Sequence, residues 1–226
     1  MLQHLTRRAG VRALSTQAPY VLPEFRVLFE EIQQDAKKNK LIKVSKLTNL
    51  FKTVTSKEEL EQSTEALKIY ERKHIDPLEN TAGEFVKACI KNEAADVALN
   101  AITQKYRIGL FLNAGTLNKL LHHFKDAGDD ASLLSAFDEM KKFDIRYNSL
   151  SYRMAISALI RTGNFDKALE LLDTAAADKQ LEHNTTNHVL IQLSKAEQKD
   201  KLEQVVESLK KHNLTLNDFG TKLTAA

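Results

Sequence analysis

The chain of 226 residues is 42% hydrophobic and 28% charged, with 33 Lys and Arg against 30 Asp and Glu and a net charge of +3. This composition is typical of a folded protein and excludes disordered and collagen-like classes. The scarcity of glycine (7) and proline (3) disfavours a turn-rich β fold, and the single cysteine, Cys89, excludes an internal disulfide. The sequence holds no run of 18 apolar residues, so we expect no membrane span.

The excess positive charge lies at the N-terminus. The first 23 residues contain Arg7, Arg8 and Arg12 and no acidic residue. Arginine-rich, acid-free segments with hydroxyl residues are typical of mitochondrial transit peptides. We therefore predict a cleaved transit peptide over residues 1–14 and a location in the mitochondrial matrix, with an uncleaved basic tail as the alternative. Cleavage would leave 30 basic against 30 acidic residues, so the net charge of +3 indicates a targeting signal rather than a nucleic-acid ligand.

Residues 15–43 are predicted to form a linker and an N-terminal capping helix. Pro23 precedes five residues at helical spacing, which are Phe25, Leu28, Phe29, Ile32 and Ala36. One apolar face at this spacing is typical of a helix that packs against a neighbouring element.

The rest of the chain repeats at a spacing of 35 residues. Thr116 and Ser151 open similar segments, and Gly128 and Gly163 follow them at the same interval. We predict five units, at about 44–78, 79–113, 114–148, 149–183 and 184–218, and a C-terminal tail over 219–226. The fifth unit needs a one-residue deletion to stay in phase. A fixed period of this length indicates a repeat architecture.

Each unit reads as two helices. In the fourth, Tyr152, Ile156 and Leu159 give the i, i+4, i+7 spacing of one helix, and Gly163 ends it. Asp166 suits the first turn of a second helix, where its charge meets the positive end of the helix dipole. One helical hairpin cannot bury its apolar face alone, so neighbouring hairpins must stack. The predicted fold is an all-α, right-handed solenoid of about five 35-residue hairpins with an N-terminal capping helix.

The best copies are TLNKLLHHFKDAGDDASLLSAFDEM (116–140) and SYRMAISALIRTGNFDKALELL (151–172). The 35-residue period, the Thr-x-Asn opening and the Ala-Leu second helix resemble the pentatricopeptide repeat family. Tetratricopeptide repeats, at 34 residues, are the nearest alternative. The segment from about Lys40 to Met140 is similar to a pentatricopeptide protein of the mitochondrial small ribosomal subunit. The resemblance implies an RNA partner.

In pentatricopeptide proteins that read sequence, the resemblance places base contacts at the fifth and last residues of each unit. Asn118 and Asn148 form such a pair in the third unit, and their amides can hydrogen-bond a pyrimidine edge. The other four units offer no plausible pair: Thr48 and Leu78, Gly83 and Asn113, Arg153 and His183, and His188 and Asp218. One base contact, at about 1–3 kcal/mol, is too little to select a transcript. A solvated role for Asn118 at a helix start is the alternative.

A lysine-rich stretch offers a different kind of RNA contact. It contains Lys37, Lys38, Lys40, Lys43, Lys46 and Lys52, with no acid between Ala36 and Ser56. Clustered lysines neutralise phosphates without reading sequence, although a charge run can equally be a solvated face. A smaller second cluster consists of Lys141, Lys142 and Arg146. The acidic residues Glu58, Glu59, Glu61 and Glu65 suit a protein partner.

We predict no catalytic activity, metal, cofactor or small-molecule substrate, because the sequence holds no HExxH, GxSxG, GxxxxGK[ST] or GxGxxG motif. The favoured function is a structural component of the mitochondrial small ribosomal subunit that contacts the rRNA backbone and neighbouring ribosomal proteins. Two alternatives stay open. The chain could be a matrix mRNA-binding translation factor. It could also be a helical-repeat subunit or assembly factor of a respiratory complex or the ATP synthase.

Overall fold

The computed structural model describes residues 21–104 and 106–224, and this part of the chain is helical without any strand. The predicted transit peptide, residues 1–14, lies outside the described residues. In the described part, no helix combines the length and the hydropathy that crossing a membrane requires.

The helices follow the predicted units as antiparallel pairs. The bounds are α1 (Phe25–Lys37), α2 (Val44–Thr53), α3 (Lys57–Arg72), α4 (Glu79–Lys91), α5 (Ala95–Thr103), the 3₁₀ helix η1 (Arg107–Phe111), α6 (Ala114–Ala127), α7 (Asp130–Lys142), α8 (Ser149–Arg161), α9 (Phe165–Ala177), α10 (His183–Lys195), α11 (Lys199–Lys211) and α12 (Asp218–Thr224). Four of the five predicted units begin at the first residue of a helix, namely Val44, Glu79, Ala114 and Ser149. The predicted all-α solenoid is confirmed.

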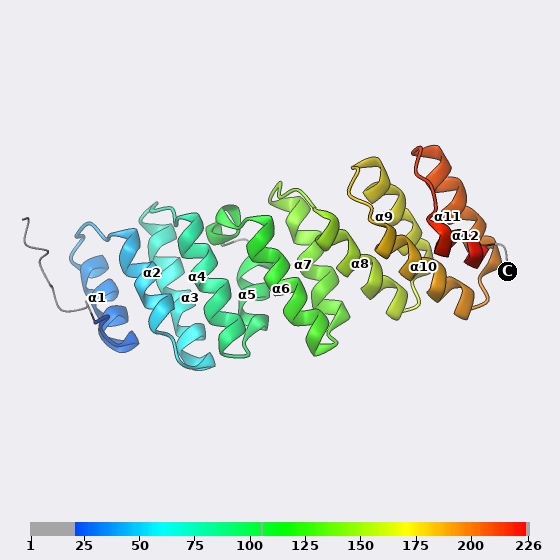
Figure 1. Cartoon of the computed structure of the whole chain (residues 1–226). Helices are drawn as coiled ribbons and strands as arrows, with labels where there is room; N and C mark the ends of the chain where they lie inside the picture. The colour runs from blue at the N-terminus through cyan, green and yellow to red at the C-terminus, as the bar shows by residue number, and fades with distance from the viewer. Residues whose placement is uncertain (1–20, 105, 225–226) are drawn as a thin grey trace, which may run out of the picture.

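The helices form two layers along an elongated array (Figure 1). The first layer contains α2, α4, α6, α8, α10 and α12, each packed on the next. The second layer contains α3, α5, α7, α9 and α11, each of which returns antiparallel to its first-layer partner. Phe51 of α2 and Phe85 of α4 pack with ring centroids 5.0 Å apart in the buried space between repeats. Contacts of this kind join neighbouring repeats into one continuous core.

The N-terminal helix α1 covers the first hairpin. It buries Phe25, Leu28 and Ile32 and packs on α2 and α3, which confirms the predicted cap. Asn39, just after α1, has a left-handed backbone (φ 51°), as does His74 just after α3 (φ 53°). These two residues are 35 positions apart, so α1 ends as a second-layer helix does.

The predicted breaks at Gly128 and Gly163 are confirmed. Both glycines follow first-layer helices and take φ values of 71° and 74°. This left-handed conformation costs glycine little because it has no Cβ.

The missing residue of the fifth unit lies in the connection between α9 and α10. Asp144 and Lys179, both left-handed, are 35 residues apart, whereas α10 begins at His183, 34 residues after Ser149. The deletion therefore falls within residues 180–182. A tail is expected over residues 219–226, but residues 219–224 belong to α12, which packs on α10 as the next first-layer helix; residues 225–226 lie outside the described residues.

The second layer opens at one joint. Helices α5 and α7 pack on each other, as do α9 and α11. Between α7 and α9 lies a groove of about 470 Å³ lined by Leu134, Phe137 and Leu171, with Tyr147 and Leu159 also lining it. The first layer stays packed at the same joint, where α6 contacts α8.

Candidate nucleic-acid interface

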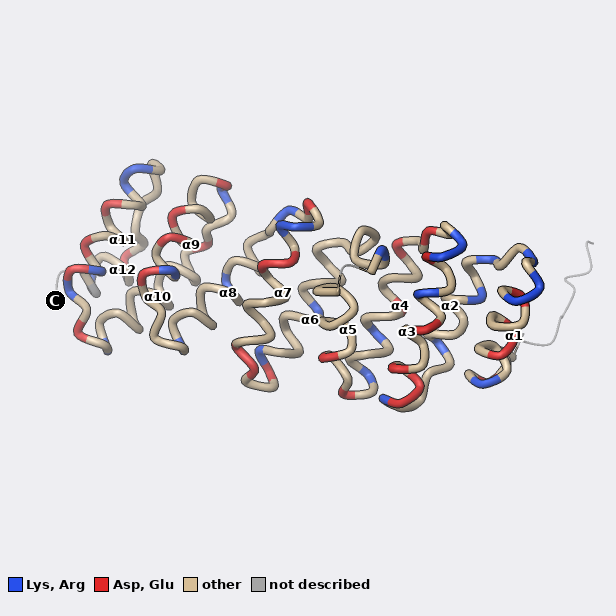
Figure 2. The backbone as a smooth tube through the Cα atoms, turned by 180° about the vertical axis from the view of Figure 1, so that it is seen from behind, with Lys and Arg blue, Asp and Glu red and all other residues tan. Residues whose placement is uncertain are grey.

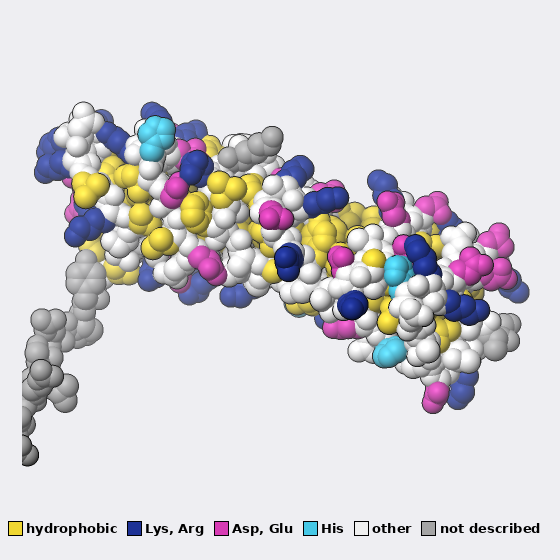
Figure 3. All heavy atoms as spheres, turned by 90° about the horizontal axis from the view of Figure 1, so that it is seen from above, with side chains coloured by type: hydrophobic (Ala, Val, Ile, Leu, Met, Phe, Trp, Pro, Cys, Tyr) yellow, Lys and Arg dark blue, Asp and Glu magenta, His cyan; other side chains and the backbone are white. Residues whose placement is uncertain are grey.

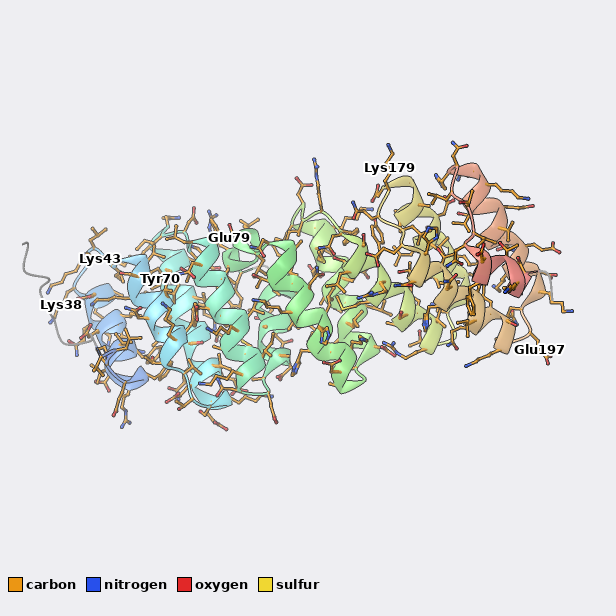
Figure 4. All side chains as sticks on the ribbon, viewed as in Figure 1. Lys38, Lys43, Tyr70, Glu79, Lys179 and Glu197 are labelled. Atoms are coloured by element: carbon orange, nitrogen blue, oxygen red, sulfur yellow. The ribbon has the colours of Figure 1, made fainter. Side chains whose placement is uncertain are left out.

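Four lysines gather in the connection between α1 and α2. Lys37 ends α1, and Lys38, Lys40 and Lys43 follow it; all four side chains are exposed. We call these four residues the lysine turn. Figure 4 shows Lys38 and Lys43 at this end of the array. None of the four forms an ion pair with another described residue, so their charges are available to a partner.

Lys46 has a different role from the lysine turn. Its Nζ atom lies 2.7 Å from Oδ2 of Asp35 and 3.0 Å from Oε2 of Glu31, both on α1. The hydrogen bond to Asp35 raises the pKa of Lys46, and the same bond lowers the pKa of Asp35. Lys52 is exposed in the last turn of α2, at the other end of that helix from Lys43. The structure therefore brings four of the six predicted lysines together and separates two.

The predicted base-contacting pair is engaged within the protein. Asn118 lies inside α6 with 6% of its surface exposed, so the solvated alternative is wrong for it. Its Nδ2 atom donates to Oδ1 of Asn148 at 3.0 Å, and Ser151 Oγ donates to Asn118 Oδ1 at 2.8 Å. Asn148 also caps α8, because its Oδ1 accepts the backbone N–H of Ser151 at 3.0 Å. A base could reach these amides only by displacing those bonds.

The same relationship recurs between other repeats. The hydroxyl oxygens of Thr48 and Thr81 lie 2.7 Å apart in the buried space between α2 and α4. In both cases the fifth residue of one first-layer helix bonds the third residue of the next. Gly83, the fifth residue of α4, faces Thr116, the third residue of α6, without a side chain to offer. This position therefore joins repeats in the array.

The structure contains a second amide pair, which the predicted start of the fifth unit, one residue too late, did not identify. Because α10 begins at His183, its fifth residue is Asn187, and the residue that precedes α12 is Asn217. Asn217 Oδ1 accepts the backbone N–H of Gly220 at 2.9 Å, and Asn187 lies beside Gly220. Asn187 and Asn217 thus occupy the places of Asn118 and Asn148, in contrast to the predicted pair of His188 and Asp218. Placing the deletion within residues 180–182 would have identified them.

The register also changes the pair of the fourth unit. The last residue before α10 is Glu182, not the predicted His183. An oxygen of Glu182 lies 3.8 Å from a guanidinium nitrogen of Arg153, the fifth residue of α8. This pair is an ion pair between neighbouring repeats.

The remaining charge clusters fall on helix ends. Lys141 and Lys142 lie in the last turn of α7 and Arg146 in the connection after it. Glu58 and Glu59 lie in the first turn of α3, where their charges meet the positive end of the helix dipole. Glu65 pairs with Lys68 on the same helix. Glu58, Glu59 and Glu65 thus stabilise α3 itself.

No group of three or more His, Cys, Asp or Glu side chains that could hold a metal occurs in the described part of the chain. His122 bonds Asp126 at 2.8 Å on the exposed face of α6. Cys89 is buried, and burial raises the pKa of its thiol.

Comparison with known proteins adds sequence and fold matches. No family model matches the chain. A mitochondrial pentatricopeptide repeat-containing protein of Arabidopsis thaliana is 26% identical over 102 residues, which cover 45% of this chain and 13% of that protein. Pentatricopeptide repeat-containing protein 2, mitochondrial, of Mus musculus is 26% identical over 137 residues, covering 58% of this chain and 35% of that protein.

The crystal structure of the pentatricopeptide repeat protein PPR10 from maize matches the fold with a TM-score of 0.52 at 16% identity. The match covers 89% of this chain and 30% of the maize chain. The sequence matches are to pentatricopeptide repeat proteins, and the maize structure shows the same fold. The chain spans about a third, or less, of the length of each of these proteins.

The fifth and last residues of the repeats in this chain are of three kinds. Asn118 with Asn148, and Asn187 with Asn217, are amide pairs, each made of the fifth residue of one first-layer helix and the residue that precedes the next. Thr48 and Arg153 contact a neighbouring repeat, and Gly83 has no side chain. The array therefore offers few groups for reading bases, and its exposed positive charge lies elsewhere.

Proposed function

We propose that this chain is a non-catalytic helical-repeat component of the mitochondrial small ribosomal subunit, located in the matrix, that contacts the rRNA backbone and neighbouring ribosomal proteins. The burial of Asn118 in a bonded contact between repeats carries this proposal. A residue in a base-reading position that holds repeats together favours a structural role over transcript selection. The resemblance of residues 40–140 to a ribosomal pentatricopeptide protein supports the same role.

The lysine turn supplies the proposed RNA contact. Its four exposed charges can neutralise phosphates and release counterions, which gives affinity that depends on salt and not on sequence. Contact that does not depend on RNA sequence is sufficient for a structural subunit, because neighbouring proteins also fix its position in the assembly. The arginine-rich first residues and the mitochondrial names of both curated relatives support the location.

A matrix mRNA-binding translation factor is the second candidate. The repetition of the amide pair at Asn187 and Asn217 favours it, because two equivalent pairs could contact two bases. At about 1–3 kcal/mol per base, two contacts give little discrimination among transcripts. This candidate therefore needs help from a further RNA-binding partner.

Sedimentation of mitochondrial lysate through a sucrose gradient, with and without ribonuclease, tests the proposal. We expect comigration with the small ribosomal subunit at high salt and release after ribonuclease treatment. Comigration with a respiratory complex, unaffected by ribonuclease, would refute it in favour of an RNA-free role. Association only with light RNA–protein particles would favour the translation factor.

The variant Lys37→Glu/Lys40→Glu/Lys43→Glu tests the lysine turn directly. We expect weaker binding to rRNA with a shallower dependence on salt concentration. Unchanged binding would show that the lysine turn is only solvated. Sequencing the N-terminus of the mature protein from mitochondria checks the transit peptide, and an intact Met1 would remove that support for the location.

A further inference from the structure

The lysine turn lies at one end of a longer charged edge. Each connection that follows α1 or a second-layer helix reaches the same side of the array, which is the upper side in Figures 1 and 4. These six connections are residues 37–43, 72–78, 106–113, 141–148, 178–182 and 210–217. We call them the basic edge. Figure 3 views the molecule from above and shows Lys and Arg recurring along its length.

The basic edge differs in charge from the opposite edge. Its described residues include thirteen Lys and Arg against four Asp and Glu. The corresponding ranges of the opposite edge, residues 53–58, 91–96, 125–130, 161–167 and 195–201, include the first residues of the helix that follows and hold eight against nine. Adding the first two residues of each following helix to the basic edge brings in Glu79 and Asp218, and the edge then still holds thirteen Lys and Arg against six Asp and Glu. Figure 2 shows the same contrast, with blue prominent along the upper connections and red more frequent below.

Ion pairs neutralise the opposite edge more fully. Lys57 pairs with Asp96, Arg161 with Asp130 and Lys201 with Asp166, and each pair joins residues of that edge. On the basic edge, Arg107 pairs with Asp76, and Lys142 and Lys211 pair with Glu139 and Asp173 of the adjoining helices. The other ten of its thirteen Lys and Arg form no ion pair among the described residues. Most of its positive charge is therefore not compensated locally.

Helix dipoles account for only part of this charge. Basic residues stabilise the last turn of a helix, which explains Lys37 or Lys141. Lys43, Arg146 and Lys179 lie beyond that turn, in the connections themselves, and are exposed. Figure 4 shows Lys43 and Lys179 at widely separated places on the upper side, and Glu197 on the lower side.

We propose that the basic edge binds double-helical RNA by contacts to its phosphates. Packed helices lie about 8–10 Å apart, so six successive connections cover roughly 50 Å. Along an A-form RNA duplex, which rises about 2.8 Å per base pair, that length corresponds to roughly 18 base pairs. The inference rests on the proposed RNA-binding function and identifies which surface serves it and which form of RNA it takes.

The aromatic residues of the basic edge favour a double helix over a single strand. Binding of single strands relies on aromatic side chains on which unpaired bases stack. Tyr147 is stacked on Phe137 with ring centroids 4.1 Å apart, and its hydroxyl donates to the Phe137 carbonyl. Tyr106, Phe111 and Phe143 are half-buried against the core. Exposed cations without exposed aromatic rings suit phosphates, which a duplex presents on its outside.

Fluorescence anisotropy with the full chain tests this surface. The probes are a labelled 20-base-pair RNA duplex and one of its strands alone. The edge variant is Lys38→Glu/Arg146→Glu/Lys179→Glu, with one change in each of three connections. The matched control, Lys91→Glu/Lys125→Glu/Lys199→Glu, alters net charge equally with exposed lysines of the opposite edge. Glu93 and Glu197 already take the left-handed backbone that Lys179 has, so glutamate is compatible with position 179.

We expect the wild type to prefer the duplex over the strand. The edge variant should bind the duplex at least about tenfold more weakly, with a salt slope shallower by about 3. The control should stay within about twofold, and both variants should melt within a few degrees of the wild type by circular dichroism. Replacing the same three cations with glutamine should weaken binding in the same direction.

Four results would overturn the inference. Equal losses in both variants would place RNA elsewhere on the chain, and a preference for the single strand would exclude the duplex as the bound form; both would leave the proposed function intact. Displacement of the duplex by poly-L-glutamate at equal charge would instead assign the edge to an acidic protein. Absence of binding to either RNA by the wild type would refute the proposed RNA contact itself.

Discussion

The Nζ atom of Lys46 lies 2.7 Å from Oδ2 of Asp35, across the contact between α2 and α1. This bond, with the second one to Glu31, fastens the capping helix to the first repeat. One lysine of a run that looks uniform in sequence is therefore structural, while its neighbours in the lysine turn face solvent.

Replacing Lys46 with methionine should lower the melting temperature, because Asp35 and Glu31 lose their common partner next to the apolar face of α1. Lys43→Met is the matched control, since Lys43 is exposed and makes no ion pair among the described residues. Thermal melts at pH 7 measure the difference. RNA affinity should fall more in Lys43→Met than in Lys46→Met, because Lys43 belongs to the lysine turn. Equal melting temperatures in the two variants would contradict the anchoring role of Lys46.

Asp173 should make the contact between α9 and α11 sensitive to acid. Its carboxylate accepts bonds from Ser208 Oγ at 2.7 Å and Lys211 Nζ at 3.0 Å, and Nε2 of His212 lies 2.9 Å away. The Ser208 bond, followed by those of Lys211 and His212, lowers the pKa of Asp173 to about 2. A lowered pKa stabilises the folded state above the unfolded value near 4, and this stabilisation is lost as the pH falls toward 2.

Asp173→Asn should therefore cost about 1 kcal/mol at pH 7, a figure reduced for the partial exposure of the side chain. The cost should shrink steadily between pH 4 and pH 2. Urea unfolding at pH 7, 4 and 2.5 measures it. Asp144→Asn is the control, because Asp144 is exposed in the connection after α7 and bonds no described side chain. A constant difference across this range would contradict the role of the carboxylate.

Gly109→Ala should destabilise the contact between the second and third repeats. A Cβ at residue 109 would lie 2.5 to 3.0 Å from the ring of Phe143, which is closer than carbon atoms approach. Overpacking of this kind costs about 1–3 kcal/mol. Urea unfolding measures the loss, and Phe143→Leu should recover part of it in the double variant. Equal losses in Gly109→Ala with and without Phe143→Leu would exclude the clash as the cause.

Cys89 should react slowly with thiol reagents in the folded protein. It is buried between α4 and its neighbours, and burial raises the pKa of its thiol, which disfavours the reactive thiolate. As the sole cysteine, it reports the opening of this region without interference. Labelling with an aromatic disulfide reagent at pH 8 should be at least about a hundredfold faster in 6 M guanidinium than in buffer. Comparable rates would show that α4 opens freely.

The sequence predicts most of the fold because the repeat period determines which residues face inward. Four unit starts coincide with helix starts, and Gly128 and Gly163 mark the ends of two first-layer helices. The ends of second-layer helices carry no such mark. His74, Asp144 and Lys179 adopt the left-handed backbone without being glycine, so the shortened connection after Lys179 could not be located.

The candidate site is less predictable, because it depends on side-chain directions between repeats. The bond from Asn118 to Asn148 and Ser151 joins residues about 30 positions apart and requires the exact offset of two helices. The basic edge is likewise spread over six connections separated by helices, so no local run of charge reveals it.

The groove between α7 and α9 makes the stiffness of the array depend on the direction of bending. At this joint the first layer is bonded through Asn118 and Ser151, whereas the second-layer helices face each other across the groove. Bending that closes the groove buries Leu134 and Leu171, and bending the other way strains the bonded layer. We expect the two arms, α1–α7 and α8–α12, to bend more easily toward the groove than away from it, so that a partner in contact with both arms would fix the curvature of the array.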